Sequence, residues 1–97
     1  MAEPVENPEP QKPSRDQISR VLVALREQAM DGYMLMDRTG LSEEGLAAVI
    51  RYLTTIGVVT IKGELTAKNV GRAYVWIPPS IRGKAEALFE SLTSPAF

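Results

Sequence analysis

The sequence predicts an α+β fold in which helices predominate, and three observations carry this prediction. Apolar residues recur at helical spacing in segments 15–29, 43–56 and 81–92. Between the last two, the stretches VVTIK and RAYVWI are rich in strand-forming residues. Glycine and proline punctuate the chain at Gly40, Gly57 and Pro78. We expect a three-helix core with a two-stranded β-hairpin and an extra C-terminal helix.

The first helix begins with an S-x-x-Q pair, Ser14 and Gln17. This is the spacing of a capping box, in which each side chain binds the other residue's backbone amide. We expect the helix to run from about 15 to 29 and to stop near Asp31–Gly32. Its apolar stripe comprises Ile18, Val21, Leu22, Leu25 and Ala29.

Gly40 separates a short second helix, over MLMDRT, from a third helix capped by Ser42. Tyr33 and Met34 form a short strand in an alternative interpretation. Gly57 ends the third helix. Its inner face comprises Leu46, Val49, Ile50, Leu53 and Ile56, and its outer face Glu43, Glu44, Ala47, Ala48, Arg51, Thr54 and Thr55.

The second strand of the hairpin alternates aromatic and aliphatic residues before Pro78–Pro79 stops it. Tyr74 and Trp76 share one face of this strand, and Val75 and Ile77 share the other. Either pair is able to cover the core, and an aromatic pair that stays exposed marks a partner surface. Ser80 is then expected to open the last helix, whose stripe comprises Ile81, Ala85, Leu88, Phe89 and Leu92.

Composition narrows the functional classes. The 97 residues carry a formal net charge of −1 and contain no cysteine or histidine. Disulfides, thiolate nucleophiles and the usual zinc ligands are therefore excluded, and we expect no enzyme, cofactor or metal. We expect residues 1–13, rich in proline and glutamate, to be a disordered tail, 14–93 one domain, and 94–97 a short tail. Without a signal-like or membrane-spanning stretch, we expect a cytoplasmic protein.

The stretch LMDRTGLSEEGLAAVIRYLTTIGVV resembles the helix-turn-helix core of winged-helix proteins. The matching positions are Leu35, Thr39, Gly40, Leu41, Ser42, Leu46, Ile50, Leu53, Gly57 and Val59. The resemblance implies a winged-helix domain over 14–93, with the hairpin as its wing. In winged-helix regulators the last helix often pairs with its twin, so the resemblance also implies a possible homodimer through Leu88, Phe89 and Leu92. The alternative is that this helix packs on the first helix of its own chain.

If the domain binds double-stranded DNA as a transcriptional regulator, its third helix, at about 43–56, enters the major groove. Arg51 is then able to contact guanine or phosphate, Ala47 or Ala48 a thymine methyl, and Thr54 and Thr55 serve as generic donors. The wing, at about 62–72, is expected to contact the DNA backbone through Lys62, Lys68, Asn69 and Arg72.

Glu43 and Glu44 stand at the start of the third helix, where they complement the helix dipole but repel phosphate. They favour a second interpretation, in which the winged helix is an adaptor that binds another protein instead of DNA.

Overall fold

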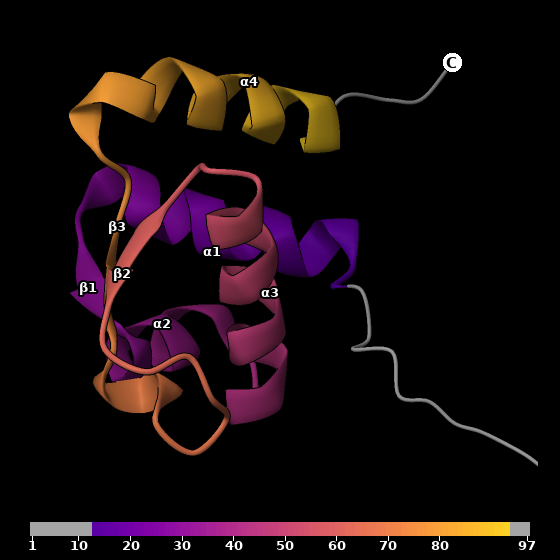
Figure 1. Cartoon of the computed structure of the whole chain (residues 1–97). Helices are drawn as coiled ribbons and strands as arrows, with labels where there is room; N and C mark the ends of the chain where they lie inside the picture. The colour runs from indigo at the N-terminus through magenta and orange to yellow at the C-terminus, as the bar shows by residue number, and fades with distance from the viewer. Residues whose placement is uncertain (1–12, 94–97) are drawn as a thin grey trace, which may run out of the picture.

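The computed structural model describes residues 13–93. The tails expected over 1–13 and 94–97 therefore lie outside the described residues, apart from Pro13. The described chain is mainly helical with a small sheet, which confirms the α+β prediction (Figure 1). In order, its elements are α1 (Arg15–Glu27), β1 (Met30–Asp31), α2 (Gly32–Thr39), α3 (Glu43–Thr55), β2 (Thr60–Lys62), the 3-10 turn η1 (Val70–Arg72), β3 (Tyr74–Trp76), the 3-10 turn η2 (Pro79–Ile81) and α4 (Arg82–Thr93).

The capping box at the start of α1 is confirmed. The Gln17 amide donates to Ser14 Oγ over 3.1 Å, and the Ser14 amide donates to Gln17 Oε1 over 2.9 Å. The helix stops at Glu27, so the expected end at Ala29 was wrong. Gln28 is already extended, with φ −168°, because the chain must straighten to bring Met30 into the sheet.

The sheet has three antiparallel strands in the order β1-β3-β2, so the predicted hairpin is present but carries a third strand. Met30 pairs with Val75 and Asp31 with Tyr74. Residues 33–34, the alternative site for a strand, lie in α2 instead. The Asp31 carboxylate accepts the Met34 amide over 2.8 Å, and this cap starts the helix immediately after β1.

The turns on either side of α3 follow the prediction. Gly40 has φ 74° and ends α2, and its amide donates to the Met36 carbonyl over 2.8 Å. Ser42 Oγ accepts the Gly45 amide over 3.1 Å at the start of α3. Gly57, with φ 75°, lies directly after the C-cap Ile56. Glycine suits both sites because a left-handed backbone strains a residue that carries a Cβ.

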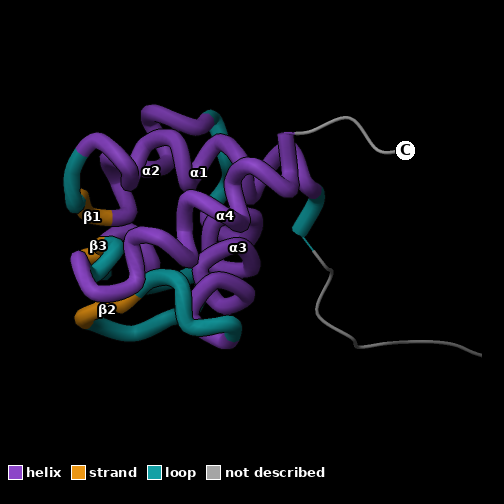
Figure 2. Tube along the Cα trace, turned by 90° about the horizontal axis from the view of Figure 1, so that it is seen from above, coloured by secondary structure: helices purple, strands orange, loops and turns teal. Residues whose placement is uncertain are grey.

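One core joins the helices to the inner face of the sheet. Leu22, Leu35, Ile50, Leu53 and Val75 are fully buried in it. In Figure 1, α1 and α3 lie on one side of the strands, and α4 runs along α1 at the top of the molecule. Figure 2 views the molecule from the α4 side. No helix among residues 13–93 is long and apolar enough to cross a membrane.

The last helix starts later than predicted. Ser80 lies within η2 and does not cap a helix, and α4 begins at Arg82. Pro78 and Pro79 explain the difference, because proline cannot donate a backbone hydrogen bond and its ring restricts the residue before it. The chain therefore makes a 3-10 turn, closed by the Ile81 amide on the Pro78 carbonyl over 3.0 Å, before the α-helix begins.

Gly32 brings α2 into direct backbone contact with η1. Its amide donates to the Ala73 carbonyl over 2.9 Å. A Cβ built on Gly32 would lie 1.9 Å from the Val70 carbonyl oxygen and 2.8 Å from Gly71 Cα. These neighbours are backbone atoms that the sheet and the 3-10 turn hold in place. Only glycine therefore allows this approach.

We expect Gly32→Ala to reduce the free energy of unfolding by about 1–3 kcal/mol, because the methyl group would overpack a rigid backbone contact. Urea unfolding followed by circular dichroism measures the change. Gly83→Ala is the matched control, since a Cβ there meets nothing within 4 Å. It should leave stability unchanged or raise it by up to about 1 kcal/mol through helix propensity. Equal stability of the two variants would contradict this account of Gly32.

Candidate functional site

Arg51 links the outer face of α3 to the loop between β2 and β3. Its side chain is exposed, and its Nη2 donates to the Leu65 backbone carbonyl over 3.1 Å. A guanidinium has five N–H donors, so this bond leaves the remaining donors of the fork available to a ligand. The contact places one cation on the seam between the helix and the loop.

Thr54 and Thr55 also lie on this part of α3, but both hydroxyl protons are used within the helix. Thr54 Oγ1 donates to the Arg51 carbonyl over 2.9 Å, and Thr55 Oγ1 donates to the same oxygen over 2.7 Å. A hydroxyl has one donor and two acceptor lone pairs. In this conformation both side chains are therefore left as acceptors, which suits an amine donor such as adenine N6 or cytosine N4. The role of generic donors, predicted from the sequence, would require these hydroxyls to leave the Arg51 carbonyl.

The two alanines of α3 differ in exposure. Ala48 is partly exposed, whereas Ala47 is only 5% exposed and belongs to the core. The predicted outward position of Ala47 was therefore wrong. The buried face of α3 is wider than the spacing of its large apolar residues indicated. Neighbouring elements therefore cover Ala47, a small residue at the border of this face.

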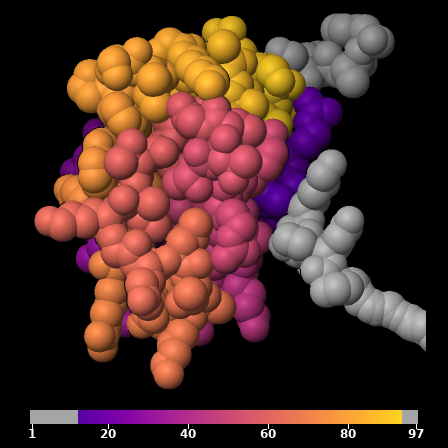
Figure 3. Space-filling view, in the orientation of Figure 1, coloured from indigo at the N-terminus to yellow at the C-terminus, as the bar shows by residue number. Residues whose placement is uncertain are grey.

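The loop between β2 and β3 carries exposed cations. Lys62 ends β2, Lys68 lies in the loop, and Arg72 ends η1. Within residues 13–93, no hydrogen bond or ion pair occupies any of these three side chains. In Figure 3, side chains of this segment project from the lower part of the molecule, beside α3. These cations can therefore meet an anion without first breaking an internal bond.

Asn69 is engaged inside the loop, and one of the two N–H donors of its side-chain amide is already used there. Its Nδ2 donates to the Glu64 carboxylate over 2.6 Å. Its backbone amide also bonds Thr66. Asn69 therefore shapes the loop and holds the loop's one acidic side chain, which is a structural task that the sequence did not reveal.

Several cations elsewhere are paired with acids. Arg20 meets Asp16 at 2.8 Å along α1. Arg26 meets Glu86 at 3.0 Å between α1 and α4, and Arg38 meets Glu27 at 3.4 Å. Exposed pairs of this kind contribute at most about 1 kcal/mol each, but they neutralise the surface where they lie. The loop cations differ from them in having no acidic partner among the described side chains.

The acidic residues at the start of α3 lie on the surface. Glu43 and Glu44 are both exposed in its first turn, next to the Ser42 cap. Their charges complement the positive end of the helix dipole, which accounts for them without a ligand. They also leave the N-terminal end of α3 unfavourable for phosphate, so positive charge on this face is confined to Arg51 and the loop.

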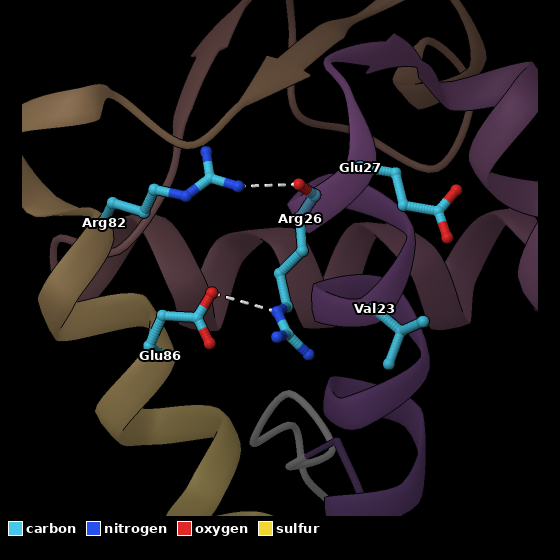
Figure 4. Close-up of a pocket in the computed structure, with 5 residues that line it drawn as sticks. All are labelled: Val23, Arg26, Glu27, Arg82 and Glu86. Atoms are coloured by element: carbon cyan, nitrogen blue, oxygen red, sulfur yellow. Dashed lines mark hydrogen bonds and ion pairs between the residues drawn. The ribbon is translucent and has the colours of Figure 1, made fainter.

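A surface pocket of about 320 Å³ lies between the end of α1 and the start of α4 (Figure 4). Arg82 donates to the Arg26 carbonyl over 2.8 Å, and Arg26 bonds Glu86 and lies 4.6 Å from the centre of the Phe89 ring. The charged residues that line the pocket are two arginines and two glutamates, so their charges cancel: Arg26, Glu27, Arg82 and Glu86. We interpret these contacts as the joint that fixes α4 on α1.

The apolar side chains proposed for a dimer are partly occupied within the chain. Leu88, Phe89 and Leu92 are half-buried and pack on the core of their own chain. Arg15 strengthens the same contact by donating to the Ser91 and Leu92 carbonyls over 2.9 and 3.3 Å. In the single chain, α4 thus packs on α1, as the alternative interpretation of the sequence expected. A homodimer stays a prediction that uses the remaining exposed part of these side chains.

The sequence did not decide which face of β3 packs on the core, and the burial of its residues does. Val75 and Ile77 point into the core, whereas Tyr74 is 48% exposed and Trp76 is half-buried. Their rings form a tilted contact, with centroids 5.9 Å apart. Tyr33, which is 58% exposed at the start of α2, is a further exposed ring that the sequence did not single out.

Arg51→Ala is expected to loosen the loop by up to about 1 kcal/mol, because the variant loses the bond to the Leu65 carbonyl. Hydrogen exchange of the Val70 amide reports this change, since that amide donates to the Thr66 carbonyl within the loop. Its exchange should accelerate, while the Ile18 amide of α1 should be unaffected. Arg72→Ala is the control and should change neither rate. If the Val70 amide exchanged at an unchanged rate in Arg51→Ala, we would conclude that the Arg51–Leu65 bond does not stabilise the loop.

Comparisons of this chain with models of protein families, with curated proteins and with solved structures find no match. The interpretation of the site therefore depends on its own geometry.

Proposed function

We propose that this chain is a winged-helix protein that binds double-stranded DNA, as a transcriptional regulator, with α3 in the major groove and the β2–β3 hairpin as the wing. The order of α1, α2 and α3 followed by the hairpin is the order expected of that family. The tight turn at Gly40 and the Ser42 cap agree with the helix-turn-helix motif.

One observation carries the DNA-binding proposal. Lys62, Lys68 and Arg72 are exposed, and none of them forms an ion pair with an acidic side chain among residues 13–93. Glu64, the acid nearest to them in sequence, is bonded to Asn69. Positive charges that are free to meet phosphates supply most non-specific affinity for DNA, because they release condensed counterions. Because the whole chain has a net charge of −1, any affinity for DNA must come from this local cluster of positive charge.

The contact between Arg51 and Leu65 supports a shared surface of α3 and the wing. On this model the wing cations position the domain on the backbone, and Arg51, with Ala48, Thr54 and Thr55, lies over base edges. A guanidinium fork can donate twice to guanine O6 and N7. Ala47 is left out of the proposed contacts because it is buried.

A second candidate, a winged helix that binds a protein partner, is favoured by Glu43 and Glu44. Both are exposed where α3 would first approach a duplex, and their charge repels phosphate. An adaptor would instead present these carboxylates to basic groups of its partner. Absence of duplex binding at micromolar protein and low salt would exclude the first proposal and leave this one.

The wing is tested by the dependence of duplex affinity on salt. For Lys68→Ala we expect weaker binding to all sequences, and a slope of log K against log salt reduced by about 0.9, the value for one lost phosphate contact. Lys84→Ala is the matched control, since Lys84 is an exposed lysine on α4. It should retain the slope of the unmodified protein. Equal slopes for the two variants would exclude the wing as the phosphate contact.

The helix is tested by sequence preference. Arg51→Ala should relax preference at one base pair and lose about 1–3 kcal/mol of discrimination there, as measured by binding to a library of duplexes. Arg51→Lys separates charge from geometry, because lysine keeps the charge but lacks the planar fork. It should keep most of the affinity while losing the same preference. If Arg51→Ala kept the full preference, we would conclude that α3 does not read the groove through Arg51.

A further inference from the structure

We propose that the outer face of the sheet, formed by Tyr74, Trp76 and Lys62, is a stacking site for the unpaired bases of single-stranded nucleic acid. This site shares the cations Lys62 and Arg72 with the wing proposed to contact duplex DNA, but its two aromatic rings lie outside those contacts. It does not depend on duplex binding, and each function can fail without the other.

The register of the sheet places these three residues on one face. Ile61 pairs with Val75, which is fully buried, so the residues on either side of that pair point outward. Lys62 is therefore opposite Tyr74, and Thr60 is opposite Trp76. In Figure 1 the helices α1 and α3 lie on the other side of the strands. The outer face thus carries two aromatic rings in the central strand with a lysine beside them.

The exposure of the rings is the unexplained feature. The core is completed on the opposite face by Met30, Val75 and Ile77, so Tyr74 and Trp76 are not needed to fill it. Because both rings are partly exposed, this pair contributes less hydrophobic stabilisation than a fully buried pair would. Their tilted contact keeps the two rings side by side on the surface. Such a pair is a platform whose exposed ring surface fits a planar, apolar partner.

Charge indicates which planar partner fits best. Lys62 is exposed and has no partner among residues 13–93, and Arg72, two residues before Tyr74, is in the same condition. Asp31 is the acid opposite Tyr74 in β1; its carboxylate accepts the Met34 amide as the cap of α2 and forms no ion pair with Lys62 or Arg72. Aromatic rings beside unpaired cations are the combination that binds single strands, with bases on the rings and phosphates on the cations. An apolar protein partner would not use these cations.

Trp76 makes the proposal directly measurable, because it is the only tryptophan in the chain. Its fluorescence is followed while a fifteen-nucleotide oligo-dT is added at low salt. Quenching with saturation is expected from stacking on the ring pair. Two further ligands are compared at equal length: a base-free phosphodiester strand and a blunt duplex. Both should quench much less, because neither presents unpaired bases.

Tyr74→Ala should weaken oligo-dT binding by about fivefold or more, which corresponds to the lower end of the stacking contribution of one base. Tyr74→Phe keeps the ring and should retain the affinity, whereas a role for the hydroxyl would make it resemble alanine. Val23→Ala is the control, since Val23 is a comparably exposed apolar residue on α1. Far-UV circular dichroism checks that each variant is folded.

The proposal is overturned by any of three results. These are no quenching by oligo-dT, equal quenching by the base-free strand, or full affinity in folded Tyr74→Ala. In the first case, capture of a protein by this face would identify a protein as its partner instead. The duplex proposal is separated by Lys68→Ala, which should reduce duplex affinity and leave the quenching by oligo-dT nearly unchanged.

Discussion

The close contact of Gly32 with η1 is the constraint on which the proposed binding surface depends. Through it the start of α2 touches the backbone at Val70 and Gly71, and the Gly32 amide completes the link to Ala73. A residue with a side chain would push these two segments apart. The contact fixes the point where the long loop returns to the sheet, and it therefore sets the positions of Arg72 and of Tyr74 just beyond it.

Two further bonds hold the same loop from other directions. Arg51 ties it to α3 at Leu65, and Asn69 ties it to its own Glu64. The loop is thus joined to helices at both ends, while its lysine and arginine side chains stay without partners within the described part of the chain. A loop backbone held by these contacts loses little conformational entropy when its cations meet a polyanion. This reasoning links the packing of the fold to the proposed contact with phosphate.

Local signals in the sequence predicted much of the fold. The caps at Ser14, Ser42 and Gly40 were predictable because each depends on residues within one helical turn. β1 was not, since two residues give no periodicity and Met30 becomes a strand only by pairing with Val75. The role of Gly32 was missed as well, because its close contact with Val70 and Gly71 joins segments that are far apart in the sequence.

The candidate site was predictable only in composition. The sequence identified Arg51 and the loop cations, but hydrogen bonds across the fold decide what they are free to do. Asn69 proved to be engaged by Glu64, which depends on the conformation of the loop. Ala47 proved to be buried, which depends on the packing of a whole helix face. The exposed face of β3 was likewise undecidable, since an alternating strand has two faces and only tertiary packing selects the buried one.

The central claim is that α3 and the wing together form a duplex-binding surface. It is tested most directly by recording amide chemical shifts in two-dimensional NMR spectra while a short duplex is added at low salt. The account predicts that the largest shifts fall in residues 48–55 and 62–72, and that the amides of α4, from Arg82 to Thr93, change little. Shifts confined to α4 and α1, or no shifts at all, would contradict it.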